Sequence, residues 1–147
     1  MTRSIEREIR IEAAPEVVYQ VLSTPEHLRE WWPDEAELDA AVPGATGSVG
    51  FRQAEGMKNV ALTVVEAEPP RRFAFRWDYD AEVATAENSL LVTFDLVPVD
   101  GGTLLRFAET GYDVAAKPDA VLQDHVSGWD YFLPRIAPYA AKLTQRP

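Results

Sequence analysis

The sequence predicts an α+β fold in which a curved antiparallel sheet carries one long C-terminal helix. Short segments of alternating apolar and polar residues are separated by turn residues, which is typical of neighbouring antiparallel strands. After them, Val126, Trp129 and Leu133 recur at steps of three and four, the spacing of one helix face. A helix over 119–143 would be about 37 Å long, close to the roughly 34 Å of a ten-residue strand. Such a helix can span the sheet, and we expect an apolar cavity between the two.

The predicted elements follow in the order strand, two short helices, six strands and long helix. The first strand covers 5–11, where isoleucines alternate with charged residues. Pro15 and Pro25 are each placed for the first turn of a short helix, and Pro33 ends the second of these helices. Turn residues rich in glycine and proline then separate six strand candidates at 35–41, 48–53, 59–67, 72–79, 89–97 and 103–112.

The long helix contains three residues that are unfavourable in a helix. Pro134 and Pro138 each remove a backbone hydrogen bond and cost roughly 3 kcal/mol in a helix interior, so the sequence predicts a kink. Gly128 costs about 1 kcal/mol relative to alanine. We expect this glycine to permit a close approach of the helix beside Trp129.

Length and composition indicate a single domain over 1–147. The 147 residues are enough for one core, and the absence of cysteine excludes disulfides, thiolate nucleophiles and cysteine-ligated metals. The net charge of −10 disfavours nucleic acid and anionic membranes as partners. The sequence has no apolar run at its N-terminus, so we expect a cytoplasmic protein with no membrane anchor.

The order and spacing of several segments resemble a known superfamily. The chain is similar to the START-like, or SRPBCC, helix-grip superfamily, and within it to the family of the ATPase activator of the ninety-kilodalton heat-shock chaperone. The segments that carry the resemblance are 14–18, 24–28, Trp31-Trp32, 66–70, 73–77, 101–103 and 125–129.

The resemblance implies a fold and leaves the function open. It implies a birch-pollen-allergen-like fold, in which a curved seven-stranded antiparallel sheet and two short helices after strand 1 grip the C-terminal helix around a hydrophobic cavity. Members of the superfamily include lipid carriers, hormone receptors, polyketide cyclases and chaperone activators, so the fold implies no single reaction. Relatives often have a histidine near the end of the last strand, where this chain has Glu109.

Glu109 and His125 are the sharpest candidates for a functional pair. Glu109 shares the alternation of Leu105 and Phe107, so we expect it to point into the cavity, where a carboxylate is costly unless it is paired, hydrogen-bonded or protonated. His125 lies on the edge of the apolar helix face at a similar depth, so the two could orient a ligand or move a proton. Two alternatives remain: Glu109 reaches solvent at the strand end, or His125 has only a local structural partner.

Aromatic side chains are the predicted wall of the cavity, although an aromatic stripe can equally be plain core. With the polar pair, the predicted ligand-binding residues are Trp31, Trp32, Phe75, Trp77, Phe107, Glu109, His125, Trp129 and Phe132.

The sequence therefore favours a carrier or sensor that binds a small apolar or aromatic molecule. It contains no nucleophile elbow, P-loop or dinucleotide motif, which disfavours a covalent or nucleotide-dependent enzyme. No metal or cofactor is expected, since the acidic residues at 34–39 alternate with apolar ones as on a solvent-facing strand. One alternative is a cyclase, dehydratase or hydrolase that uses Glu109 and His125 as acid and base. Another is an interaction module with a protein partner, like the chaperone activator.

Overall fold

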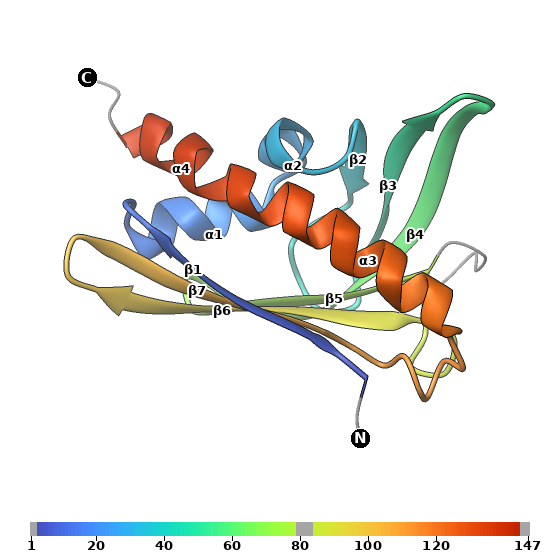
Figure 1. The fold of residues 1–147 in the computed structure, drawn as a ribbon. Helices are drawn as coiled ribbons and strands as arrows, with labels where there is room; N and C mark the ends of the chain where they lie inside the picture. The colour runs from blue at the N-terminus through green and yellow to red at the C-terminus, as the bar shows by residue number, and fades with distance from the viewer. Residues whose placement is uncertain (1–2, 79–83, 145–147) are drawn as a thin grey trace.

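Seven strands form one antiparallel sheet, which the C-terminal helices cross on one face (Figure 1). The computed structural model describes residues 3–78 and 84–144. The spatial strand order is β1-β7-β6-β5-β4-β3-β2, so only β1 and β7 are paired without being sequential neighbours in this meander. The elements are β1 Ile5–Ile11, α1 Pro15–Ser23, α2 Pro25–Trp31, β2 Glu35–Leu38, β3 Thr46–Gln53, β4 Gly56–Glu68, β5 Arg72–Asp78, β6 Leu90–Val99, β7 Gly102–Thr110, α3 Asp119–Phe132 and α4 Ile136–Thr144.

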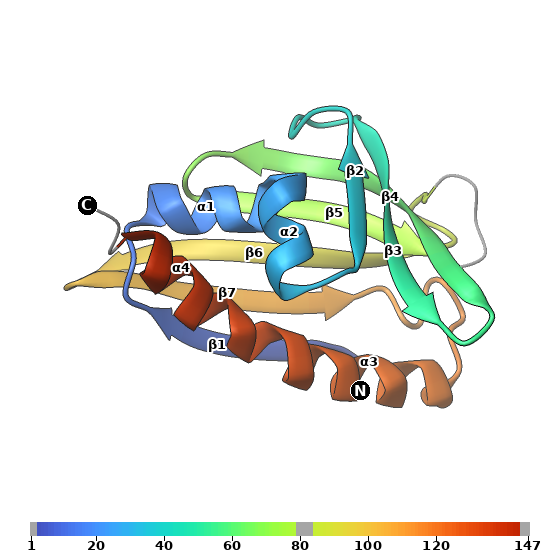
Figure 2. The same cartoon turned by 90° about the horizontal axis from the view of Figure 1, so that it is seen from above.

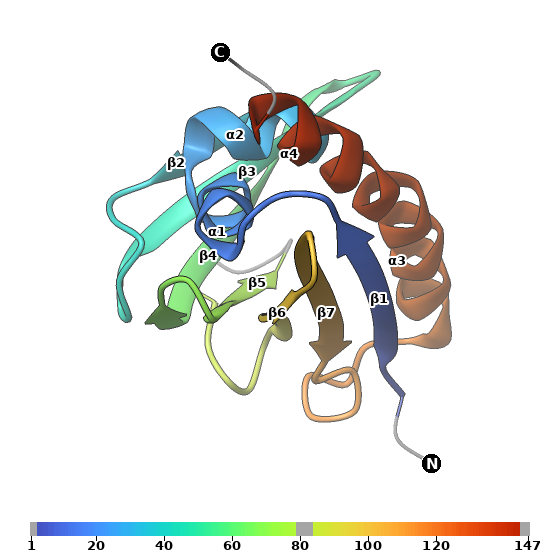
Figure 3. The ribbon, with the colours of Figure 1, turned by 90° about the vertical axis from the view of Figure 1, so that its left-hand side faces the viewer.

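All helices lie on the concave face of the sheet. Viewed from above, α1 and α2 cover the middle strands, while α3 and α4 run along the side formed by β1 and β7 (Figure 2). Seen end on, the sheet curls around these helices (Figure 3). The predicted helix-grip architecture is confirmed. Within the described part of the chain, no helix is both long and apolar enough to cross a membrane.

The inner face of the sheet follows the predicted alternation. In β5, Phe73, Phe75 and Trp77 are buried, and in β7, Phe107 and Glu109 are buried. Side chains at every second strand position point to the same face. This face forms one continuous apolar core with α1, α2 and the C-terminal helices.

Two predicted strands are longer than the observed ones. The segment 35–41 is strand only to Leu38, because the chain then turns towards β3 through Gly44, which has a φ of 89°. The segment 103–112 is strand only to Thr110, because Gly111 adopts a φ of 100°, a conformation that is costly for other residues. The end of the predicted strand 72–79 lies at residue 79, outside the described residues.

The long helix is interrupted where the sequence predicts a kink. α3 ends at Phe132, a single 3₁₀ turn covers Leu133–Arg135, and α4 begins at Ile136. Pro134 lies in the 3₁₀ turn and Pro138 in the first turn of α4, and the N–H of Ile136 donates to the carbonyl oxygen of Leu133 across this junction. The cost of about 3 kcal/mol expected for each proline in a helix interior stays a prediction.

Salt bridges attach α3 to β1 at the sheet edge. Arg7 occupies the inward alternation of β1 and donates to both carboxylate oxygens of Asp130, at 2.8 and 3.2 Å. This hydrogen bonding to Arg7 holds the pKa of Asp130 below its usual value. Arg3 similarly binds Asp113 and Asp119 at the beginning of α3, both at 2.8 Å. These contacts fix the helix that carries His125 and Trp129.

Candidate functional site

The centre of the candidate site is the carboxylate of Glu109, which is completely buried. Its position in β7 lies between Ile5 of β1 and Val92 of β6. Four side chains donate hydrogen bonds to it: Trp77 Nε1 at 2.8 Å, His125 Nδ1 at 2.8 Å, Trp129 Nε1 at 3.1 Å and the hydroxyl of Tyr112. Four donors fit the ionised carboxylate, which only accepts hydrogen bonds, and they replace the water that burial removes.

The four donors converge from three parts of the fold. Trp77 comes from the inner face of β5. His125 and Trp129 are four residues apart on α3, which places both on the same side of that helix. Tyr112 reaches back to Glu109 because the left-handed conformation of Gly111 turns the chain directly after β7.

The contact with Glu109 also fixes the orientation of the imidazole ring. Since the carboxylate oxygen can only accept, His125 Nδ1 carries the proton of this hydrogen bond. The ring is thereby held in one orientation, between Trp77 at a centroid distance of 5.3 Å and Tyr112 at 6.0 Å. A carboxylate that orients a histidine in this way also selects the tautomer that the ring presents to a ligand.

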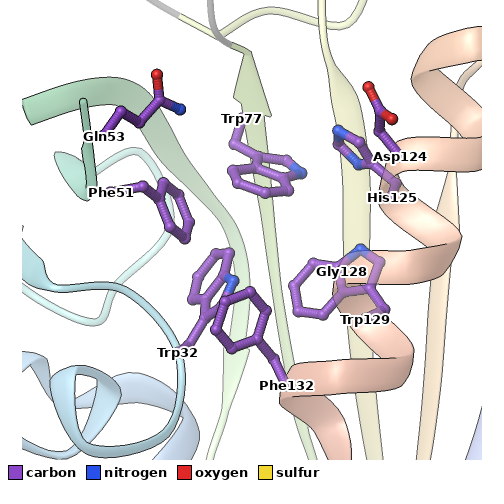
Figure 4. Close-up of a pocket in the computed structure, with 9 residues that line it drawn as sticks. All are labelled: Trp32, Phe51, Gln53, Trp77, Asp124, His125, Gly128, Trp129 and Phe132. Atoms are coloured by element: carbon purple, nitrogen blue, oxygen red, sulfur yellow. The ribbon is translucent and has the colours of Figure 1, made fainter. Parts of the chain in front are cut away.

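A cavity of about 200 Å³ opens directly beside this network. Figure 4 shows its wall, with His125 and Trp129 of α3 on one side, Phe51 on the opposite side and Trp77 between them. The lining residues are Trp32, Phe51, Gln53, Trp77, Asp124, His125, Gly128, Trp129 and Phe132. Trp77, His125 and Trp129 are at the same time hydrogen-bonded to Glu109, so one buried carboxylate holds three residues of the cavity wall in place.

Another hollow, of about 250 Å³, shares Trp77 and His125 with this cavity. It is lined by Lys58, Asp78 and Lys117 together with those two rings, Leu90 and Val121. Lys117 forms an ion pair with Asp78, whose side chain is only 6% exposed. The two rings thus line both an aromatic cavity and a hollow that contains two lysines and one aspartate. Within the described residues, no group of three or more His, Asp or Glu side chains is arranged to hold a metal ion.

Comparison with known proteins identifies the family. The sequence pattern described as activator of Hsp90 ATPase homolog 1-like protein matches residues 12–141, which is most of the chain. The chain belongs to the activator of Hsp90 ATPase homolog 1-like (AHSA1-like) family. The resemblance stated from the sequence is therefore confirmed. No curated protein matches the chain.

Solved structures share the fold of this AHSA1-like protein. Protein MLL2253 from Mesorhizobium loti is 22% identical with a TM-score of 0.78, and the match covers 95% of this chain and 98% of that chain. Protein NE0264 from Nitrosomonas europaea is 13% identical with a TM-score of 0.78, over 97% of both chains. The Aha1 dimer from Colwellia psychrerythraea is 25% identical with a TM-score of 0.69, over 91% of this chain and 92% of that chain.

The AHSA1-like fold divides the predicted ligand-binding residues into two groups. The residues on the cavity wall are Trp32, Trp77, His125, Trp129 and Phe132. Trp31, Phe75 and Phe107 are packed in the apolar core, and Glu109 is buried behind the residues that line the cavity. Trp31 is completely buried and donates its Nε1 hydrogen to the carbonyl oxygen of Val21, while the ring of Phe107 supports Trp129 at a centroid distance of 4.7 Å.

Several residues of the AHSA1-like site were missed in the sequence analysis. Phe51 and Gln53 reach the cavity because the β3–β4 hairpin rises from the sheet on the side of α3 (Figure 1). Phe51 and Gln53 lie two and four residues after the buried Val49, and this spacing could have indicated that both face the inside of the sheet. Tyr112 was predicted only as a strand end. Its role depends on the turn at Gly111, which the strand pattern does not show.

Gly128 has a different role from the one expected. A Cβ atom added at Gly128 would meet no atom within 4 Å, so the expectation of close helix packing beside Trp129 is wrong. Gly128 instead borders the cavity. The absent side chain leaves room in the cavity wall of this AHSA1-like domain at the cost of some helix stability.

Proposed function

We propose that this AHSA1-like protein binds a small ligand of predominantly apolar or aromatic surface in the cavity beside Glu109. The observation that carries the proposal is the hydrogen bonding of three wall residues, Trp77, His125 and Trp129, to one buried carboxylate. A wall fixed in this way needs little rearrangement when a ligand enters, and preorganisation improves affinity because less conformational entropy is lost.

The composition of the cavity supports a ligand with one polar group. Five lining residues are aromatic, which is the usual character of a small-molecule site. Gln53, Asp124 and His125 are the polar lining residues, and such groups orient a bound molecule. The proposed roles are therefore affinity from the rings and orientation from these three side chains.

The indole N–H signals of the four tryptophans provide a local test by NMR. Three of them, Trp32, Trp77 and Trp129, line the cavity, whereas Trp31 lies in the core and serves as an internal control. Titration of the ¹⁵N-labelled protein with indole and with 2-naphthol should shift the three cavity signals in a saturable manner and leave that of Trp31 nearly unchanged. If the cavity signals stay in place up to the solubility limit of both probes, the proposal is wrong.

A cavity-filling variant tests the location of binding. Gly128→Leu places a side chain in the cavity and should weaken binding of indole by more than about tenfold, equivalent to about 1.4 kcal/mol. Ser127→Leu adds the same side chain at the neighbouring exposed position and is the matched control. Equal affinity in both variants would place the binding site elsewhere. Native mass spectrometry of freshly purified wild-type protein would show whether a small molecule is retained.

A further inference from the structure

We propose that the cavity selects a small organic cation with a methylated ammonium head, such as a trimethylammonium group. This inference rests on the proposed function, because it names the ligand class of the same cavity. It follows from three features of the wall: its aromatic rings, the sign of the charges around it, and the position of its hydrogen-bonding groups.

The rings of the wall come from several elements and lie close together. Trp32, the residue that follows α2, stacks on Trp129 of α3 and makes a T-shaped contact with Trp77 of β5, each with 5.1 Å between ring centroids. The ring centroid of Phe51 in β3 lies 6.3 Å from that of Phe132 in α3. The face of an aromatic ring carries negative electrostatic potential and attracts a cation within about 6 Å of its centroid, most strongly for tryptophan.

The carboxylates at the cavity wall are negative, while the two lysines near Trp77 line the neighbouring hollow. The buried carboxylate of Glu109 accepts the indole N–H groups of Trp77 and Trp129, and Asp124 is part of the lining. The burial of Glu109 leaves its charge less screened by water than a surface charge. None of the nine lining residues is lysine or arginine, and Arg52 lies on the opposite face of β3 from Phe51 and Gln53. The net charge of −10 adds a favourable field for cations.

The distribution of polar groups favours a methylated head over a primary ammonium. A primary ammonium has three N–H donors, and the five tryptophan and phenylalanine side chains of the wall offer it no oxygen or nitrogen acceptor. A trimethylammonium head has no N–H donor and presents an apolar surface with a diffuse positive charge. Asp124 and Gln53 remain available to the polar end of such a molecule.

The neighbouring hollow suggests a competing hypothesis, in which the ligand is an anion. Lys58 and Lys117 line it with Asp78, so a carboxylate-bearing ligand could extend past His125 into that hollow. Preference for an anion would therefore contradict the proposal.

Three ligands of similar shape separate these outcomes. Choline carries a trimethylammonium head, 3,3-dimethyl-1-butanol is its neutral carbon analogue, and 3,3-dimethylbutyrate is an anion with the same branched head. In titrations followed by the indole N–H signals, choline should bind at least about tenfold more tightly than the alcohol, since ring faces attract a desolvated cation and have no such attraction for the neutral analogue. The signals of Trp32, Trp77 and Trp129 should move, and that of Trp31 should not.

Variants test the origin of the preference. Phe132→Leu keeps an apolar side chain but removes a ring, and Asp124→Asn removes a charge; both should lower the ratio of choline affinity to alcohol affinity. For Asp124→Asn we expect a factor of about two to five, the size of an exposed charge interaction. Ser127→Leu, outside the cavity, is the control and should leave the ratio unchanged.

The outcomes distinguish this inference from the proposed function. If the alcohol or indole binds in the cavity as tightly as choline or more tightly, the cation preference is wrong and the binding function stands. If the butyrate binds most tightly, the lysine-lined hollow determines the ligand and the cation preference is again wrong. If none of the ligands, indole included, moves the cavity signals, both the preference and the proposed binding function are wrong.

Discussion

At the scale of single residues, Glu109 shows how hydrogen bonds stabilise a buried carboxylate in an apolar core. An unpaired carboxylate in an apolar interior would be strongly destabilising. Here, two indole N–H groups, one imidazole N–H and one hydroxyl all point at it. The same four donors would lose this acceptor if the carboxylate were removed, so the group and its partners stabilise one another.

We expect Glu109→Gln to lower the free energy of unfolding by about 1–3 kcal/mol, although the shape of the side chain is kept. An amide has one oxygen acceptor and one NH₂ donor group, so at least one of the four donors would face another donor. Urea unfolding measures the loss. Glu12→Gln, at an exposed position, should stay within about 0.5 kcal/mol of the wild type. Unchanged stability of Glu109→Gln would contradict the hydrogen-bond network described above.

At the scale of elements, the break between α3 and α4 explains why two prolines are tolerated in one long helical segment. Pro134 lies in the 3₁₀ turn, and Pro138 lies two residues after the beginning of α4. Buried Leu133 and Ile136 hold both sides of the break against the core. The chain can therefore change direction there without losing the apolar contacts of either helix.

Pro138→Ala should change the free energy of unfolding by less than about 1 kcal/mol, because the 3₁₀ turn directly before α4 already interrupts the α-helical hydrogen bonding there. As a contrast, Ser127→Pro places proline at an exposed position inside α3 and should cost about 3 kcal/mol or more. Both values come from urea unfolding. A stabilisation of about 3 kcal/mol by Pro138→Ala would instead show that Pro138 interrupts a helix interior.

At the scale of the whole molecule, one core connects the sheet with all of the helices. Core residues come from β1, α1, α2, the middle strands and α4, and they form a single cluster. The large apolar side chains that are exposed within the described ranges are Val42, Val65, Val114 and Tyr131. They come from different parts of the chain, and single exposed apolar residues are normal in soluble folds.

The shared core predicts that the chain unfolds as a single cooperative unit, in agreement with the expectation of one domain. Urea unfolding followed by far-ultraviolet circular dichroism reports on the backbone, and tryptophan fluorescence reports on Trp31, Trp32, Trp77 and Trp129. The two curves should coincide and give the same midpoint. Separate transitions would show that part of the fold, such as the C-terminal helices, unfolds independently.

Local periodicity was sufficient to predict which way the key side chains point. The alternation of Leu105, Phe107 and Glu109 indicates that Glu109 faces inward, and the spacing of His125 and Trp129 places them on one helix face. The order of strands and helices also follows from turn residues and apolar patterns. These features depend on neighbours in the sequence, so the sequence by itself determines them.

Only the tertiary structure decides which inward-facing rings border empty space. Phe75, Trp77 and Phe107 satisfy the same alternation, yet Trp77 lines the cavity while the other two pack in the core. The difference arises from the curvature of the sheet and its distance from α3 at each point. The rise of the β3–β4 hairpin and the turn that returns Tyr112 to Glu109 likewise depend on contacts between segments far apart or on a single backbone conformation. A repeating sequence pattern indicates on which face of the sheet or helix a side chain lies. A cavity depends instead on how closely the sheet and the helix approach each other at that point.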